Sequence, residues 1–205
     1  MGLPLGSPKG FNMKLIIASN NAHKIYEIKK ILSGKFEEIL SLREAGISHE
    51  TVEDGTTFIE NALKKAREIA EISGCAALAD DSGICAHALG GEPGIYSARY
   101  AGDHSGNAPD EANNALLLKN LADKADRGAH YTAAIALVYP DGREVTAEGY
   151  MYGKIIDEHR GTRGFGYDPI FVPDGETRTV AEMTDEEKNA ISHRANALNT
   201  LLCKL

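Results

Sequence analysis

Two acidic residues, Asp80 and Asp81, stand side by side where an apolar run, residues 76–79, gives way to Ser82 and Gly83. A buried strand that stops there would deliver both carboxylates to the rim of a sheet, where open α/β sheets bind their ligands. Because neighbouring negative charges repel, the pair invites a divalent metal ion or a raised carboxyl pKa. An acidic turn that only caps the next segment is the alternative.

Polar residues after an earlier apolar segment could bind phosphate. Residues 19–24 read Ser-Asn-Asn-Ala-His-Lys and precede a helical pattern. Free backbone N–H groups at a helix start, together with Lys24, suit an anion, although the segment has no Walker A pattern. The simpler interpretation is that Ser19 or Asn21 caps the helix and that Lys24 is solvated.

A third acid, Glu53, lies in a loop before another helical pattern that carries Lys65. Glu53 could join Asp80 or Asp81 around Mg²⁺, which prefers carboxylate and phosphate oxygens. Acids near a helix N-terminus are also favoured by the helix dipole, so this motif alone leaves both interpretations open.

A glycine-dense segment, residues 161–169, could bind an aromatic ligand. Glycines on both sides of Phe165 let the backbone approach a ligand closely, and an aromatic face can stack on a purine. Lys188, His193 and Arg194 could donate to a carbonyl oxygen or a phosphate. A turn-rich structural loop and a solvated basic face are the alternatives.

The elements that would position these residues alternate between strand and helix, and Pro-Asp-Gly at 140–142 indicates a hairpin. Thr184 opens a capping box, and Ser192 breaks the helix that follows. We therefore expect an α/β fold with an elongated mixed sheet flanked by helices, and two lobes with the active site in the cleft between them. The expected strands are 14–18, 76–79, 131–139 and 144–156, and the expected helices are 22–32, 56–73, 110–121 and 184–205.

Composition narrows the class of protein. The chain has 205 residues and a formal net charge of −8, with no basic stripe, which argues against a nucleic-acid polymer as partner. No segment approaches the roughly 20 apolar residues that span a bilayer, so we expect no membrane partner. Its 3 cysteines are widely spaced, which favours a cytoplasmic protein with free thiols. We expect residues 1–12 to form a flexible extension and residues 13–205 a single domain.

Several motifs in fixed order resemble the inosine/xanthosine triphosphate pyrophosphatase family. They are Ser-x-Asn-x-x-Lys, Thr-Phe-x-Glu-Asn-Ala, Asp-Asp-Ser-Gly, Gly-Gly-x-Pro-Gly-Ile-Tyr-Ser-Ala-Arg-Tyr, Gly-Phe-Gly-Tyr-Asp-Pro-Ile-Phe and Glu-Lys-Asn-Ala-Ile-Ser-His-Arg. The resemblance covers essentially residues 13–205. It implies a Mg²⁺-dependent enzyme that hydrolyses noncanonical purine nucleoside triphosphates (ITP, dITP and XTP) to the monophosphate and pyrophosphate, which cleanses the nucleotide pool. It also implies a homodimer.

By this resemblance, Asp81 is the general base and Asp80 its partner, and Asp81, Glu53 and Asp80 surround the metal. The residues that bind the base would donate hydrogen bonds to the purine O6 acceptor. Adenine would leave these donors unpaired, whereas guanine also has O6, and the sequence does not show how guanine is excluded. A pyrophosphatase of the septum-formation-inhibitor type and a nucleotide sensor without turnover are the rival functions. The residues implied to bind substrate are Ser19, Asn20, Asn21, Ala22, His23, Lys24, Lys65 and Ser82 for the phosphates, and Phe165, Gly166, Tyr167, Asp168, Lys188, His193 and Arg194 for the base.

Overall fold

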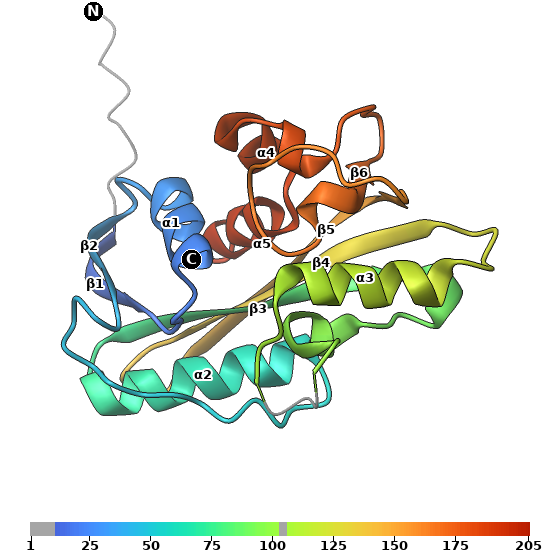
Figure 1. The fold of residues 1–205 in the computed structure, drawn as a ribbon. Helices are drawn as coiled ribbons and strands as arrows, with labels where there is room; N and C mark the ends of the chain where they lie inside the picture. Colours follow the sequence, from blue (N-terminus) through green and yellow to red (C-terminus); the bar gives the residue numbers. More distant parts are fainter. Residues whose placement is uncertain (1–10, 103–105) are drawn as a thin grey trace, which may run out of the picture.

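A six-stranded sheet in the order β2-β1-β3-β4-β5-β6 forms the centre of the computed structural model, which describes residues 11–102 and 106–205 (Figure 1). The strands are β1 (Phe11–Ile17), β2 (Phe36–Ser41), β3 (Ala76–Ala86), β4 (Gly128–Val138), β5 (Glu144–Ile155) and β6 (Phe171–Pro173). The α-helices are α1 (Ala22–Ile31), α2 (Phe58–Ser73), α3 (Asp110–Leu121), α4 (Asp185–Ile191) and α5 (His193–Leu202), and four short 3-10 helices are η1 (His87–Leu89), η2 (Gly94–Arg99), η3 (Asp168–Ile170) and η4 (Val180–Glu182).

The sheet is mixed, as the sequence predicts. β1 pairs in parallel with β2 and β3, whereas β3, β4, β5 and β6 pair with one another in antiparallel fashion. The hairpin expected at 140–142 joins β4 to β5, and the amide of Gly142 donates to the carbonyl of Tyr139 at 3.0 Å. This topology confirms the predicted α/β class.

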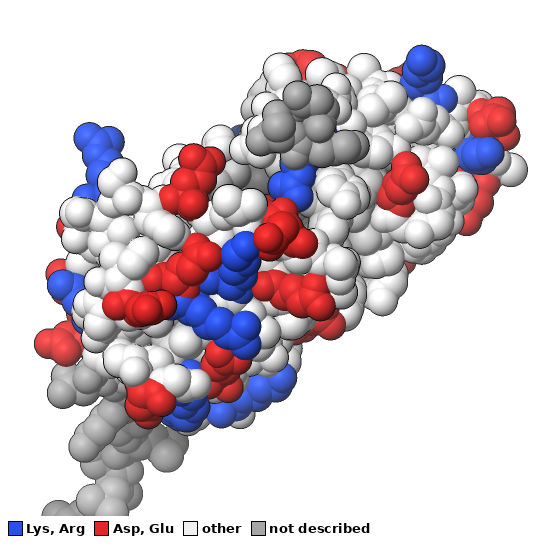
Figure 2. Space-filling view, turned by 90° about the horizontal axis from the view of Figure 1, so that it is seen from below, with Lys and Arg blue, Asp and Glu red and all other residues white. Residues whose placement is uncertain are grey.

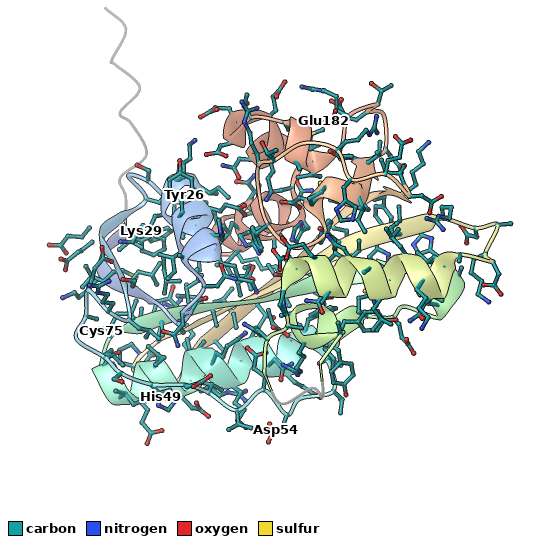
Figure 3. The ribbon with its side chains drawn as sticks, viewed as in Figure 1. Tyr26, Lys29, His49, Asp54, Cys75 and Glu182 are labelled. Carbon is teal, nitrogen blue, oxygen red and sulfur yellow. The ribbon has the colours of Figure 1, made fainter. Side chains whose placement is uncertain are left out.

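Helices cover the two faces of the sheet unequally. In Figure 1, α2 lies below β3 and β4, while α1 and α5 lie above the sheet. Ala62, Ala66 and Ile69 of α2 pack on small residues of β3 and β4, and Leu198 and Leu201 of α5 pack on the opposite face. The apolar side chains in the helical patterns therefore form the core, and the side chains drawn in Figure 3 fill the layers between helices and sheet.

The prediction that the apolar strand ends at the acidic pair is wrong. β3 continues to Ala86, so Asp80 and Asp81 lie in its middle, opposite Ile135 and Ala134 of β4. Gly83 lies within the strand, and this position needs a glycine because a Cβ there would lie 2.3 Å from Oγ of Ser97. Close packing against η2, and not a turn, explains the Ser-Gly sequence.

The two edge strands, β2 and β6, are not predicted from the sequence. Among the described strands β2 pairs with β1 alone, and β6 has 3 residues. β1 begins at Phe11, two positions before the predicted domain boundary, and Phe11 pairs with Phe36. Residues 1–10 of the predicted extension, and residues 103–105, lie outside the described residues.

Ser192 separates the last two helices, as predicted. Ser192 is the C-cap of α4 and the N-cap of α5, and its side chain accepts a hydrogen bond from the amide of Ala195 at 3.2 Å. Thr184 and Glu187 form the predicted capping box at the start of α4. The break at Ser192 brings Lys188 on α4 and Arg194 on α5 to the same buried region.

Candidate active site

Asp80 and Asp81 point to opposite faces of the sheet because successive side chains of a strand alternate. Asp80 contacts residues of α1 and α5, and Asp81 contacts residues of α2. Both carboxylates are buried, with 1% and 5% of their surface exposed. The adjacent acids therefore have separate partners.

Asp80 is paired with two cations. Its Oδ2 lies 3.0 Å from Nε of Arg194, and its Oδ1 lies 2.8 Å from Nζ of Lys24. The hydroxyl of Ser82 also donates to Oδ1 at 2.9 Å. Burial would raise the pKa of Asp80, but Arg194 and Lys24 hold this pKa well below its ordinary value. Asp80 is therefore ionised, and both of its oxygens are engaged by the protein.

Asp81 has a different environment. Its Oδ1 lies 3.2 Å from Nζ of Lys65, and its Oδ2 accepts from the amide of Asn61 at 3.2 Å. Burial raises the pKa of Asp81, and the positive charge of Lys65 offsets this effect only in part. A buried carboxylate with a raised pKa is suited to accept a proton from a water molecule.

Lys65 joins Asp81 to Glu53. Its Nζ lies 2.7 Å from Oε1 of Glu53 and donates to the carbonyl of Asp80 at 3.0 Å. Burial would raise the pKa of Glu53, but the charges of Lys65, Lys24 and Arg99 hold it below its ordinary value. Glu53 and Asp81 are therefore two carboxylates on either side of one ammonium group.

The loop that carries Glu53 is attached to α2. His49 contacts Glu68 at 2.7 Å, and Asp54 pairs with Lys64 at 2.6 Å. Figure 3 labels His49 and Asp54 along this loop below α2. These two contacts hold Glu53 beside the first turns of the helix, although the Asp54 side chain itself is largely exposed.

The residues around the start of α1 cap this helix, which is the simpler of the two interpretations that the sequence left open. Asn21 caps α1 by accepting from the amide of Lys24 at 3.1 Å, and Oγ of Ser19 accepts from the amide of Asn21 at 3.1 Å. Lys24 is not a solvated side chain, because it reaches Asp80. Asn20 donates to the carbonyl of His49 at 3.3 Å, and Ala22 is exposed.

A pocket of about 130 Å³ lies on the Asp80 face of the sheet. This volume is well above the roughly 10–15 Å³ that a single water molecule needs by such a measure. The predicted residues that line it are Asn21, Lys24, Ser82, Phe165, Gly166, Tyr167, Asp168, Lys188, His193 and Arg194. The predicted residues that do not line it are Ser19, Asn20, Ala22, His23, Glu53, Lys65, Asp80 and Asp81.

The ring of Phe165 is surrounded by groups that could hold an aromatic ligand. His23 stacks on it with centroids 5.1 Å apart and an angle of 16°. Nζ of Lys188 and Cζ of Arg194 lie 4.9 Å and 5.9 Å from its centroid. His23, in the first turn of α1, thus belongs to the Phe165 region of the structure.

Asp168 holds the loop around Phe165 in place. Its Oδ2 accepts from the amide of Phe165 at 3.0 Å and from Nζ of Lys188 at 2.8 Å. Gly164 is required here because its φ is +75° and because a Cβ would lie 2.1 Å from Oδ2 of Asp168. Asp168 therefore fixes the positions of Phe165 and Lys188, two of the residues predicted to bind the base.

His193 is a neutral group within the pocket. Its ring stacks on that of Tyr131 with centroids 4.7 Å apart and an angle of 10°. Burial, and then the charge of Arg194, lower the pKa of His193 well below its ordinary value. Its Nδ1 is buried and has no hydrogen-bond partner among the described residues, so this atom is free to contact a ligand.

Sequence reasoning missed several residues of the site. Glu27 contacts both Lys188 and Arg194, Tyr131 donates to Asp168 at 3.3 Å, and Asn61 contacts Asp81. Glu27 could have been found, because it follows Lys24 by three positions and shares a helix face with it. Asn61 belongs to the Thr-Phe-x-Glu-Asn-Ala motif, which carried no assigned role, whereas Tyr131 lies within an ordinary strand pattern and only the fold brings it to the site.

Comparison with known proteins assigns the chain to a family. The model of the Ham1 family matches residues 15–204. The chain belongs to the Ham1 family. Ham1 relatives from Streptomyces coelicolor and Leuconostoc mesenteroides, both named dITP/XTP pyrophosphatase, are 48% and 50% identical to it. The alignments cover 92% and 94% of this chain and 95% and 96% of the relatives. The resemblance seen in the sequence motifs is confirmed.

Solved Ham1 structures share the fold. The Staphylococcus aureus Ham1 protein is 40% identical, with a TM-score of 0.82, over 93% of this chain and 96% of its own. A HAM1 protein from Coxiella burnetii is 39% identical, with the same TM-score of 0.82, over 94% of this chain and all of its own. The mixed sheet with its flanking helices is therefore the fold of this family.

Proposed function

We propose that this Ham1 protein hydrolyses noncanonical purine nucleoside triphosphates, namely ITP, dITP and XTP, to the monophosphate and pyrophosphate. The observation that carries the proposal is the pair of environments on β3: a buried carboxylate of raised pKa on one face, and on the other a pocket with an aromatic ring and fixed donors. The names of its close relatives support the substrate class. Such hydrolysis would keep these nucleotides out of DNA and RNA.

The triphosphate would lie between the start of α1 and α2. Lys24 lines the pocket, and Lys65 lies beside Asp81, so the two ammonium groups could neutralise phosphate charge from both faces of β3. Small polar side chains that could also contact the phosphates belong to Ser19, Asn20, Asn21 and Ser82. We place the active site in the cleft between two lobes of the domain that residues 13–205 form.

The two carboxylates Glu53 and Asp81 fit a Mg²⁺ ion whose coordination is completed by substrate phosphates and water. Mg²⁺ commonly binds through one or two carboxylates, and among the described residues no group of three metal-ligating side chains gathers at one point. Asp80 is less suited to direct coordination, because two cations, Arg194 and Lys24, contact its oxygens, whereas one cation, Lys65, contacts those of Asp81. When bound, Mg²⁺ would neutralise charge that develops on the phosphates.

Asp81 would act as the general base. Its carboxylate would take a proton from a water molecule as the water oxygen bonds to the α-phosphorus, and the α–β phosphoanhydride bond would break to release pyrophosphate. Asn61 and Lys65 hold the two oxygens of Asp81 in place. Asp80 would fix Lys24 and Arg194 on the opposite face of the strand.

Base selection would take place around Phe165. The purine would stack near this ring, and Lys188, His193 and Arg194 would donate to the O6 acceptor of hypoxanthine or xanthine. An adenine presents an amino group there and would leave buried donors unpaired, which costs on the order of 1–3 kcal/mol for each group.

The setting that we propose is a homodimer in the cytoplasm, acting on small nucleotides and not on nucleic-acid polymers or membranes. None of the described helices combines the length and the apolar character that a membrane span requires, and all 3 cysteines are free thiols. The rings of His87, His130, Tyr150 and Tyr152 form a group, which we call the aromatic patch, in which His130 is half-buried and the other three residues are exposed. Aromatic residues are enriched at interfaces, so the patch supports an assembled state.

Product analysis in ¹⁸O-labelled water tests the proposed reaction. Purified protein with Mg²⁺ should convert ITP to IMP and pyrophosphate, with the label in IMP, because attack is at the α-phosphorus. Release of inorganic phosphate, or label in pyrophosphate, would contradict this chemistry. Excess EDTA should stop turnover, and added Mg²⁺ should restore it. Binding of ITP without turnover would favour a sensor, and faster turnover of pyrimidine nucleotides would favour the septum-formation-inhibitor type.

A further inference from the structure

A continuous line of buried ion pairs connects β3 to the loop that carries Phe165. Nζ of Lys24 lies 2.8 Å from Asp80, and Asp80 lies 3.0 Å from Nε of Arg194. At the other end, Nζ of Lys188 lies 2.8 Å from Oδ2 of Asp168. The two halves correspond to the two parts of the proposed substrate, because Asp80 lies on the catalytic strand and Asp168 holds the base wall.

Glu27 joins the two halves. Its Oε1 lies 2.8 Å from Nζ of Lys188, and its Oε2 contacts Nη1 of Arg194. Only 7% of the residue's surface is exposed. Within residues 11–102 and 106–205, no other carboxylate contacts both of these cations.

The position of the two cations depends on this carboxylate. Lys188 and Arg194 carry like charges, line the same pocket and both lie near the centroid of the Phe165 ring, at 4.9 Å and 5.9 Å. Buried like charges repel strongly where water does not screen them. Asp80 attracts Arg194 toward β3, and Asp168 attracts Lys188 toward its loop, so only Glu27 holds the two donors next to each other.

We propose that Glu27 is a positioning residue that sets the spacing of the Lys188 and Arg194 donors and thereby determines selectivity for purines with an O6 acceptor. This inference rests on the proposed function and deepens it. Glu27 does not touch the substrate in this account. It acts through the two cations, which the bound base would contact.

Glu27→Gln removes the charge while keeping the size of the side chain. A glutamine can accept from one cation, but its amide NH₂ faces the other, so the two donors separate. We expect the ratio of kcat/KM for ITP to that for ATP to fall by about tenfold or more, chiefly through a higher KM for ITP. Inhibition by tripolyphosphate, which lacks a base, should change by less than about twofold. Glu27→Asp keeps the charge and should retain part of the selectivity.

The matched control is Glu186→Gln. Glu186 on α4 pairs with Lys30 on α1 at 2.7 Å, so its loss also removes an ion pair between the same two helices, but at the surface. This variant should keep the wild-type ratio. An unchanged ratio in Glu27→Gln would overturn the inference, even if its Tm were lower. If Glu27→Gln does not fold, the Glu27→Asp variant provides the test. A ratio of kcat/KM for ITP to that for ATP that is lowered about threefold or more supports the inference, and a wild-type ratio overturns it.

Binding measurements separate this inference from the proposed function. The affinities of ITP, ATP and tripolyphosphate are measured by calorimetry without Mg²⁺ on the wild type and on Glu27→Gln. If the wild type binds ITP but does not hydrolyse it, the proposed function fails and the affinities still test Glu27. Selective weakening of ITP relative to tripolyphosphate supports the inference, and equal weakening of both overturns it.

Discussion

At Asp80, two cations more than offset the effect of burial on the carboxyl pKa, whereas at Asp81 the charges of Lys65 and Lys24 do not. The two residues are adjacent in the sequence, and the difference arises because β3 sends their side chains to opposite faces. Asp80, an ionised group that binds two cations, is thus followed on the same strand by Asp81, a proton acceptor. The division of roles between the two acids has its physical basis in this alternation.

Replacement of Asp81 by asparagine tests its proposed role. Asp81→Asn should lower kcat for ITP by about 10²- to 10⁴-fold, because general-base catalysis contributes that much. The dissociation constant for ITP should change little, since the amide preserves the shape of the side chain. Rapid-quench turnover and calorimetry measure the two quantities. Asp54→Asn, in the exposed part of the same loop as Glu53, is the control, and full turnover of Asp81→Asn would remove Asp81 as the base.

The neutral His193 predicts how stability depends on pH. Its pKa in the folded protein lies well below the ordinary value of 6.5, so below pH 6.5 the unfolded chain binds the extra proton. This contribution to stability is therefore complete above pH 6.5 and is lost as the pH falls from there toward the lowered pKa. The limiting slope is about 1.4 kcal/mol per pH unit.

Urea unfolding between pH 7.5 and pH 5.5 measures this effect. His193→Gln should have a smaller loss of unfolding free energy over this range than the wild type, whatever its stability at pH 7.5. His159→Gln, at an exposed position, should have the wild-type slope. Equal slopes for all three proteins would show that His193 is not held neutral by burial.

At the scale of elements, close contact between α5 and β5 places Arg194 and His193 over the sheet. A Cβ on Gly149 of β5 would lie 2.2 Å from the amide of Ala197 and 2.3 Å from the carbonyl of His193. Gly149→Ala would force α5 away from the sheet and should lower the free energy of unfolding by about 1–3 kcal/mol or more. It should also weaken ITP binding.

Thermal unfolding and calorimetry measure both effects of Gly149→Ala. Gly106→Ala is the matched control, because none of the described residues places an atom within 4 Å of a Cβ at that position. The control should keep the wild-type Tm and affinity. A Gly149→Ala protein with wild-type Tm would contradict the close packing of α5 on β5.

Regular elements could be predicted from the sequence where their pattern is strong. The expected helix at 110–121 has the bounds of α3, and the break at Ser192 follows from its capping chemistry. The end of β3 could not be predicted, because Ser82 and Gly83 suit a turn and only Ser97, far along the chain, shows why a glycine is needed in the strand. β2 was missed because Phe36–Ser41 is short and its burial does not alternate regularly.

The residues of the candidate site were predictable as motifs, but their partners were not. The sequence indicated Lys188, Arg194 and Asp168, whereas Glu27 on α1 contacts residues more than 150 positions away. A buried acid with two cationic partners differs from a solvated one only through tertiary packing. Pattern reasoning can therefore name the groups of such a site before the fold shows how they are connected.

At the scale of the whole molecule, the charge on one face is unevenly spread. Figure 2 shows Lys, Arg, Asp and Glu of both signs gathered over the half that carries α2, while the middle of the other half is mostly uncharged. Tyr150 and Tyr152, which are 40% and 53% exposed, point away from α5 because Gly149 faces that helix. The aromatic patch is the surface that we expect to contact a second copy.

A charge in the aromatic patch tests the proposed homodimer. Tyr152→Glu should shift the protein from dimer to monomer in size-exclusion chromatography with light scattering, because an interface disfavours an unpaired buried carboxylate. Tyr26→Glu is the control, since Tyr26 is 55% exposed on α1, where Figure 3 labels it, outside the patch. A wild-type monomer would contradict the dimer, and a Tyr152→Glu dimer would place the interface elsewhere.

The central claim is that one buried carboxylate and one selective pocket make this chain a pyrophosphatase for noncanonical purine nucleotides. Values of kcat/KM for ITP, XTP, ATP and GTP, measured with Mg²⁺ by release of pyrophosphate, test it most directly. We expect kcat/KM for ITP and for XTP to exceed that for ATP by at least about 10²-fold, because the wrong base leaves buried donors unpaired. Equal values for ITP and ATP, or no release of pyrophosphate from ITP, would contradict it.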